Sequence, residues 1–448
     1  MLADFGYTDG YKKNTAKKQA GKKTHFFSKF TKNFDGEKNN SSNLTITSQK
    51  VSNDKYLKLY KIKSTLVDFN QDTLENSINF TKENDNLFFN FNASVYETLK
   101  DNYEDKYEYI FPEILFDKNL FSNNNLGNLD LQTNLKVNSY DTNKFSNFLI
   151  NDFVWNYKDI KHKSGFMSKF LGNFKNINYE TKNIDIYKED STSEFYGALG
   201  YLAKINLQKT TSFSEHFLKP KLLLRYAPGA MRLEKSGLRL DTVNAFSLNR
   251  LNSVNNFETG LSTSIGLDYN IKRNNSNFDF SIAQVINAEE NDKMPDNSSL
   301  NEKLSDLVGS TKLELNENID LKYNFSLDQN YKNFNYNEIG ATINYENFKF
   351  NFDYILEEKH IGDQEYFKTK IDLINKNNNL LSFETKRNLV TNSSEFYNLS
   401  YEYMNDCLRA GLVYRREFYT DSEIESENSL MFKITLVPFG SINGPSFN

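Results

Sequence analysis

The sequence predicts an all-β fold, namely a large antiparallel transmembrane β-barrel of the outer-membrane type with roughly 20–26 strands. Two observations predict it. Apolar and polar residues alternate one by one in segment after segment of the 448 residues, as they do on a strand with one apolar and one polar face. The sequence also contains no run of about 18 apolar residues, so it offers no membrane-spanning helix.

The alternation is clearest at residues 87–95. Its apolar positions are Leu87, Phe89, Phe91, Ala93 and Val95, and between them lie Phe88, Asn90, Asn92 and Ser94. Residues 341–356 show the pattern twice, on either side of a short polar break. A soluble sandwich uses such alternation for about seven or eight strands. Alternation along nearly a whole chain is typical of a closed barrel with lipid outside and water inside.

Residues 1–7 have the pattern of the end of a strand. Each later strand of the first half is expected where apolar residues recur at every second position, for example at Leu129, Leu131, Leu135 and Val137. These expected strands cover residues 25–34, 43–51, 76–82, 87–95, 107–116, 129–137, 145–155, 195–207 and 218–226. The lysine-rich stretch 161–172 is expected to be a connector.

The second half of the chain continues the same rhythm. Its expected strands cover residues 244–249, 261–269, 278–287, 312–315, 319–328, 341–345, 348–356, 366–373, 380–385, 396–403, 408–419 and 430–438. Residues 289–304 are polar and are expected to be a connector. No shift in composition marks a second domain, so we expect one barrel domain over residues 1–439 and a C-terminal tail over residues 440–448.

The composition fits a barrel with a wet interior. Hydrophobic residues make up 38% of the chain, against about 45–50% in soluble globular domains, because a large barrel needs apolar residues only on its outer face. The net charge of −5 argues against a nucleic-acid-binding protein, because such proteins carry basic patches. The single cysteine, Cys407, excludes an internal disulfide framework and a cysteine-based zinc cluster.

The sequence lacks the common motifs of catalysis and of metal or cofactor binding. No G-x-S-x-G, P-loop, H-E-x-x-H or C-x-x-C motif occurs. The four histidines are far apart in the sequence, at His25, His162, His216 and His360. We therefore expect no enzyme, no catalytic residue, no metal and no cofactor, although a nucleophile and a base that faced each other across a barrel would leave no spacing signal.

The middle of the chain contains a distinctive series of motifs. It starts with Lys-Pro-Lys-Leu-Leu-Leu-Arg-Tyr-Ala-Pro-Gly at residues 219–229. Further motifs lie at residues 239–241, 246–250, 260–262, 266–269, 284–286, 294–295, 298–300 and 305–309, and others at 3–7, 25–30, 401–403, 405–408 and 414–416. In this order they resemble the barrel of the LptD family, the outer-membrane component of lipopolysaccharide export, over nearly the whole chain.

The resemblance implies a translocon that inserts lipopolysaccharide into the outer leaflet of the outer membrane of a Gram-negative bacterium. Family members join a barrel of typically about 26 strands to a periplasmic jelly-roll domain. We expect that domain and a signal peptide to be absent here, so that the barrel is N-terminally truncated. The implied partners are lipopolysaccharide, an LptE-like plug lipoprotein, an LptA-like periplasmic bridge protein, the barrel-insertion machinery and outer-membrane lipids, with no nucleic acid.

A few residues take a role from the resemblance. Cys407 lies where the family has a cysteine that pairs with the N-terminal domain, which implies a disulfide to a partner outside this chain; a buried or idle thiol is the alternative. The last expected strand has Phe432, Ile434 and Leu436 on one face, and the resemblance implies that it forms one wall of a lateral seam. Pro438 cannot donate a ladder hydrogen bond, which suits a strand edge that must part.

Two other functions remain open from the residues alone. A general porin or receptor-type barrel that passes small solutes would share the alternation, but it does not account for the motif series of residues 220–269 or for the lone cysteine near the C-terminus. A surface adhesin anchored by a barrel would need a passenger domain rich in repeats, and the sequence shows none.

Overall fold

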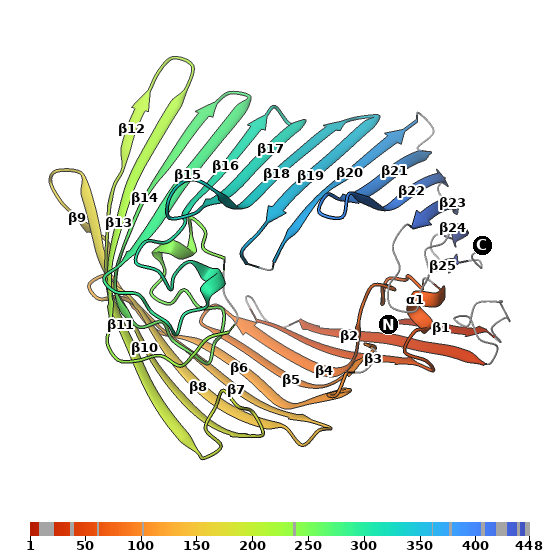
Figure 1. The fold of residues 1–448 in the computed structure, drawn as a ribbon, viewed down its shortest axis with the longest axis horizontal. Helices are drawn as coiled ribbons and strands as arrows, with labels where there is room; N and C mark the ends of the chain where they lie inside the picture. Colours follow the sequence, from red (N-terminus) through yellow and green to blue (C-terminus); the bar gives the residue numbers. More distant parts are fainter. Residues whose placement is uncertain are drawn as a thin grey trace.

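The strands of the protein form one continuous sheet. The computed structural model describes residues 1–8, 22–35, 40–60, 62–100, 103–235, 239–360, 362–375, 379–404, 408–417, 428–436 and 440–443. In these residues 25 strands make a single sheet that curves around a central space (Figure 1). Paired strands are antiparallel, and apart from the short β9 and β12 they follow one another along the chain. The predicted all-β fold with an antiparallel, barrel-like sheet is confirmed.

The first half of the sheet contains the longest strands. They are β1 (Leu2–Thr8), β2 (Lys23–Asp35), β3 (Ser41–Val51), β4 (Thr73–Asn84), β5 (Leu87–Thr98), β6 (Tyr107–Asn123), β7 (Gly127–Tyr140), β8 (Phe145–Asn156), β9 (Ile160–Lys161), β10 (Phe166–Lys182), β11 (Thr192–Ile205), β12 (Leu207–Thr210) and β13 (Glu215–Ala227). A short helix, α1 (Tyr56–Tyr60), lies in the connection between β3 and β4.

The second half is built from shorter strands. They are β14 (Gly260–Arg273), β15 (Ser276–Asn287), β16 (Leu307–Leu315), β17 (Ile319–Leu327), β18 (Phe334–Tyr345), β19 (Phe348–Glu357), β20 (Gln364–Ile374), β21 (Leu380–Asn388), β22 (Ser393–Met404), β23 (Leu408–Glu417), β24 (Asn428–Leu436) and β25 (Gly440–Asn443). Two 3-10 turns, η1 (Asn244–Phe246) and η2 (Asp296–Ser298), lie in the connections that follow β13 and β15.

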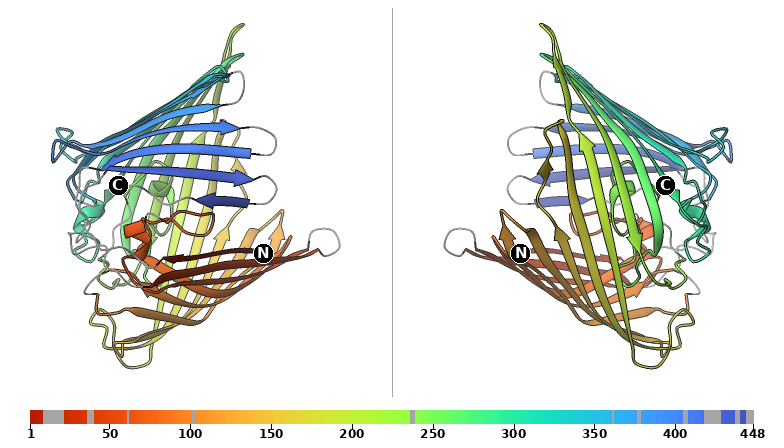
Figure 2. Two further views of the ribbon diagram at one scale, coloured as in Figure 1. Left: turned by 90° about the vertical axis from the view of Figure 1, so that its right-hand side faces the viewer. Right: turned by 90° about the vertical axis from the view of Figure 1, so that its left-hand side faces the viewer.

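The described strands leave the sheet open on one side. β1 pairs with β2 and β25 pairs with β24, and among the described residues no pairing joins β1 to β25. Figure 2 shows this side facing the viewer in its left view, with the blue C-terminal strands above the red N-terminal ones.

The alternation of the sequence becomes the two faces of the sheet. On β11, Phe195 and Leu199 are each 66% exposed on the outer face, whereas Tyr196 and Ala198 are buried on the inner face. Large apolar side chains are exposed in the same way on many other strands: Phe5, Phe26, Ile78, Phe170, Phe174, Leu224, Leu261, Ile265, Ile339, Leu373, Leu412 and Phe432. Such a surface is typical of a wall that faces lipid. In the described part of the chain, no helix combines the length and the apolar character that a membrane crossing requires.

Two segments differ from the prediction. Residues 244–249 were expected to be a strand, and that prediction is wrong: the 3-10 turn η1 and an irregular stretch lie there instead. Residues 161–172 were expected to be a connector, and that prediction is wrong too, because β10 begins at Phe166. Its inner side chains Leu171, Ile177 and Tyr179 are buried rather than wet, which conceals the polar-inside pattern that identifies the other strands. The predicted connector at 289–304 does lie between β15 and β16.

Candidate functional site

Two long connections fold into the interior of the sheet instead of extending away from it. They are residues 228–259, between β13 and β14, and residues 288–306, between β15 and β16. Figure 1 shows both, with η1 and η2, inside the curve of the green strands. We call the described part of these two segments the lumen plug. Connections of this length without regular structure are uncommon in compact domains and are usually functional.

The lumen plug is fixed to the wall by two apolar clusters. The first joins plug residues to β15 and β16 and consists of Met231, Leu240, Ala245, Ala283, Val285, Met294, Leu300 and Val308. The second joins the plug to β8, β10, β11 and β13 and consists of Phe148, Ile150, Ile177, Tyr179, Tyr196, Ala198, Ala227 and Phe257. Because burial of apolar area drives this packing, the plug behaves as part of the protein core.

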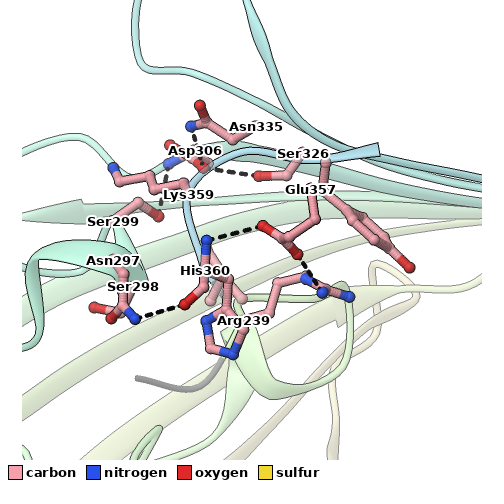
Figure 3. Close-up of a pocket in the computed structure, with 12 residues that line it drawn as sticks. Arg239, Asn297, Ser298, Ser299, Asp306, Ser326, Asn335, Glu357, Lys359 and His360 are labelled. Carbon is pink, nitrogen blue, oxygen red and sulfur yellow. Dashed lines mark hydrogen bonds and ion pairs between the residues drawn. The ribbon is translucent and has the colours of Figure 1, made fainter. Parts of the chain in front are cut away.

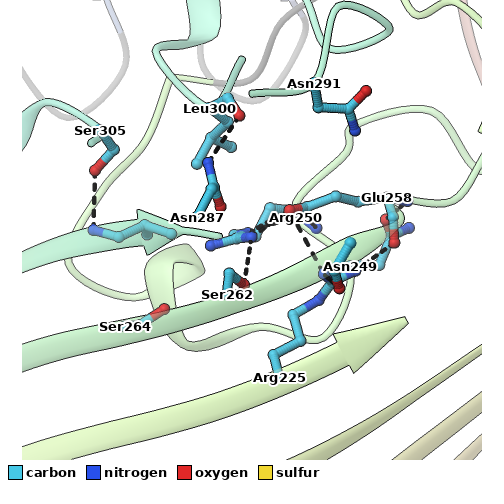
Figure 4. A network of polar contacts seen from close by, with 12 residues as sticks. Arg225, Asn249, Arg250, Glu258, Ser262, Ser264, Asn287, Asn291, Leu300 and Ser305 are labelled. Carbon is cyan, nitrogen blue, oxygen red and sulfur yellow. Dashed lines mark hydrogen bonds and ion pairs between the residues drawn. The ribbon is translucent and has the colours of Figure 1, made fainter. Parts of the chain in front are cut away.

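Three buried charges lie at the centre of the plug (Figure 4). The guanidinium of Arg250 contacts the carboxylate of Glu258 through Nε, at 2.8 Å from Oε2 and 3.1 Å from Oε1. Arg225 of β13 lies 3.7 Å from the same carboxylate and donates to the carbonyl oxygens of Leu248 at 2.6 Å and Gly260 at 3.3 Å. All three charged side chains are at most 4% exposed. The triad therefore ties the irregular plug backbone to the regular wall.

Burial alone would raise the pKa of the Glu258 carboxyl, but Arg250 and Arg225 outweigh burial and hold that pKa below its ordinary value of 4.5. A lowered pKa in the folded state contributes stability that is complete above pH 4.5 and is lost as the pH falls through the folded-state pKa. We expect the free energy of unfolding to be independent of Glu258 ionisation from pH 5 upward and to fall below pH 4.5. A pH series of unfolding curves checks this, because Glu258→Gln removes that part of the pH slope.

A third buried cation, Lys175, fixes another side of the plug. Lys175 of β10 is 4% exposed. Its ammonium lies 3.0 Å from the Asp152 carboxylate, donates to the carbonyl oxygen of Val254 at 3.2 Å and stands 5.7 Å from the centre of the Phe257 ring. Asp152 satisfies the charge, so burial of this lysine is tolerated, and the plug backbone gains a second polar attachment.

Polar contacts of Arg239, Asn297 and Asp306 attach one end of the plug to β17, β18, β19 and the residues after β19 (Figure 3). We call this set of contacts the hook and this end the outer end of the plug. Arg239 forms an ion pair with Glu357, and its guanidinium lies 3.6 Å from the ring centre of Tyr336. Asn297 donates to the carbonyl oxygen of His360 at 2.8 Å.

A second part of this hook centres on Asp306, which accepts hydrogen bonds of 2.8 Å from Ser326 and from Asn335. The hook encloses a cavity of about 10 Å³, which is room for about one water molecule and not for a larger ligand.

The residues singled out from the sequence do not lie together in this plug. Phe432 and Ile434 are on β24; Phe432 is exposed on the outer face and Ile434 is half-buried. Leu436 ends the same strand, opposite Leu408. Cys407 and Pro438 fall outside the described residues. Their predicted roles in a disulfide and a lateral seam stay predictions.

The charged triad was not predicted from the sequence, although the sequence contains a signal for it. Arg225 and Arg250 lie inside the motifs at residues 219–229 and 246–250, but a strand pattern gives no reason for an arginine there. Within the described ranges, no group of three or more His, Cys, Asp and Glu side chains is placed to hold a metal ion. The plug and the polar wall beside it can bind a polar solute or block its passage through the interior.

Comparison with known proteins gives one informative match. The family model described as "LptD: LPS transport system D" matches residues 160–406, which include the whole lumen plug. No curated protein matches the chain. Among solved structures, two mutants of the Rh. blastica porin are 7% and 9% identical to it, with 64% and 66% of this chain and 89% and 91% of the porin chains covered and TM-scores of 0.25 and 0.24.

Proposed function

Since the chain belongs to the LptD family, LPS transport system D, we propose that it is an outer-membrane barrel that inserts lipopolysaccharide into the outer leaflet. The observation that carries the proposal is the family match over residues 160–406, which covers the plug and the strands that hold it. The chemistry of the two faces supports it. An apolar outer surface suits acyl chains and lipid, and a polar interior suits the saccharide.

We further propose an orientation for the barrel. Bacterial barrels carry short turns at the periplasmic rim and longer loops at the outer rim. The connections 228–259 and 288–306 leave one rim, whereas the two-residue turns at 85–86, 274–275 and 346–347 lie at the other. The lumen plug then closes the barrel from the cell exterior, which would keep small toxic solutes out while lipopolysaccharide is delivered.

The remaining parts of the transport system are proposed from the family. They are an LptE-like lipoprotein, an LptA-like bridge that reaches the barrel through a jelly-roll domain, and the barrel-insertion machinery. Residues 1–439 are proposed to act as the barrel domain, with Cys407 in a disulfide to the N-terminal domain and Phe432 and Ile434 on the strand at the lateral seam. The protein is proposed to act without catalysis.

Conditional depletion of the protein in its own cells tests the proposed function. We expect newly made lipopolysaccharide to stop reaching the cell surface and to accumulate inside, and we expect re-expression to restore it. Surface labelling of pulse-labelled lipopolysaccharide measures both. Unchanged delivery during depletion, together with lost uptake of small solutes, would identify a porin instead.

The outer face gives a separate prediction about the membrane. Leu199 lies in the middle of β11 and is exposed outward. Replacing it with arginine would place a charge against the lipid core and is expected to lower the free energy of unfolding in bilayers by about 2–4 kcal/mol. The matched control is Asn351→Arg on the polar inner face of β19, where we expect almost no change. Equal effects of the two variants would contradict the assignment of the faces.

A further inference from the structure

The inner face of the barrel wall is chemically divided into two parts. On β17 to β22 it carries opposite charges in pairs: Lys322 and Glu338 at 2.7 Å, Lys368 and Glu384 at 2.7 Å, Lys370 and Asp372 at 3.1 Å, and Lys386 and Glu395 at 3.0 Å. We call this part the charged wall. On β3 to β5 the corresponding inward positions carry amides and hydroxyls, and we call that part the amide wall: Asn43, Thr45, Thr47, Ser77, Asn79, Thr81, Asn90, Asn92 and Ser94.

The amide wall is ordered across the strands. Thr45 of β3 is opposite Asn79 of β4, Asn79 is opposite Asn92 of β5, and Asn92 is opposite Glu113 of β6. The Asn90 amide donates to Asn79 at 3.2 Å and to the Thr81 hydroxyl at 2.9 Å. Amides and hydroxyls each offer donors and acceptors, so the part of the row on β3 to β5 presents a ladder of uncharged hydrogen-bonding groups.

A cavity of about 420 Å³ lies against this wall, within the size range of small-ligand sites. Its lining comes entirely from β2 to β6: Lys29, Thr45, Thr47, Glu75, Ser77, Asn79, Asn90, Asn92, Tyr96 and Glu113. The lumen plug packs on β8, β10, β11, β13, β15 and β16 instead. The cavity is therefore lined by strands other than those on which the apolar clusters of the plug pack.

The charges of the lining select among polar ligands. The lining contains one lysine and two glutamates, and Glu113 also lies 3.9 Å from Lys136 of β7, so the site has no surplus of positive charge to hold an anionic group such as a phosphate. Tyr96 adds an aromatic ring with a polar tip, which can pack on the apolar face of a sugar ring and still hydrogen-bond. Neutral, hydroxyl-rich molecules satisfy the amides and the ring together.

We propose that the amide wall is a binding site for uncharged sugars, along which the neutral part of the lipopolysaccharide saccharide passes. This inference rests on the proposed function and adds to it a place and a chemical selectivity. The charged wall is less suited to a neutral sugar, because the eight charged side chains named above already pair with one another.

Site-specific photocrosslinking in cells that make the protein tests the site. One probe replaces Thr47 on the amide wall and another replaces Lys370 on the charged wall. We expect lipopolysaccharide adducts mainly at position 47, and mass spectrometry of the attached fragment should find neutral sugars. In the Asn79→Leu/Asn92→Leu background the adduct should fall about tenfold, as for the loss of two hydrogen-bonding side chains, whereas Asn351→Leu on the charged side should leave it unchanged.

The other outcomes distinguish failure of the sugar site from failure of the proposed function. Heat-modified gel mobility first confirms that each variant forms a folded barrel. Three outcomes would overturn the sugar site and leave the proposed function standing. They are stronger adducts at position 370, phosphorylated fragments at position 47, and capture of a protein in place of saccharide at position 47. No adduct at either position, with surface delivery independent of the protein, would remove the proposed function itself.

Discussion

Replacement of Glu258 with alanine is expected to release the lumen plug and to lower the free energy of unfolding by about 3–5 kcal/mol. The side chain of Glu258 is 4% exposed and supplies the negative charge that two arginines share. Without it, Arg225 and Arg250 remain buried with no carboxylate partner, and removal of one member of a buried ion pair leaves a charge that neither water nor a partner compensates.

Two measurements check this expectation. Denaturant unfolding of the purified protein gives the loss of stability, and entry of a bulky antibiotic into cells reports an open lumen. Glu290→Ala is the matched control, because Glu290 is exposed in the connection after β15, and its removal is expected to change neither quantity. A Glu258→Ala protein as stable and as impermeable as the parent would show that the triad does not hold the plug.

The second large effect is expected at Phe257. This side chain is fully buried, its ring centre lies 6.0 Å from that of Tyr196, and the Lys175 ammonium stands over it. Phe257→Ala would leave a cavity between the plug and β10 and β11, at a cost of about 3–5 kcal/mol.

Limited proteolysis separates a loosened plug from an unfolded barrel. In Phe257→Ala we expect faster cleavage within residues 248–258 and unchanged protection of the strands. The control is Phe213→Ala in the turn before β13, where the ring is 84% exposed. Cleavage that spreads through the strands as well would mean that the plug and the wall unfold together.

The wall of the barrel was predictable from the sequence because a strand has a period of two. The segment 87–95 lies in β5 with Phe89 and Phe91 facing outward, opposite Lys82 and Phe80 of β4. Period-two reasoning works where one face meets lipid and the other meets water. It failed at β10, because the inner face of that strand packs on the plug and carries the apolar side chains Ile177 and Tyr179 beside the buried Lys175.

The plug was not predictable by the same reasoning. Residues 244–249 were expected to be a strand, but the Asp241 carboxylate accepts hydrogen bonds of 2.7 Å from the backbone N–H groups of Val243 and Asn244, and contacts with β14 add to this turn. The Ser264 hydroxyl, for example, donates to the carbonyl oxygen of Ala245 at 2.5 Å. Arg250 and Glu258 are close in the sequence, so their pairing is local. Arg225, the second arginine beside Glu258, comes near only when β13 and β14 pair. The motifs at residues 219–229 and 246–250 indicated that this part of the chain is distinctive, but they did not predict how the plug folds.

Two of the ion pairs of the plug differ in the length of chain that they close. Arg250 and Glu258 are 8 residues apart, whereas Arg239 and Glu357 are 118 residues apart. Loop-closure entropy grows with the logarithm of that length, so the distant pair costs the unfolded chain about 2 kcal/mol more to bring together. The triad can thus assemble from one hairpin during insertion. The ion pair of Arg239 with Glu357 can form only after β16 to β19 have joined the sheet. Attachment of the outer end of the plug therefore depends on assembly of that part of the wall.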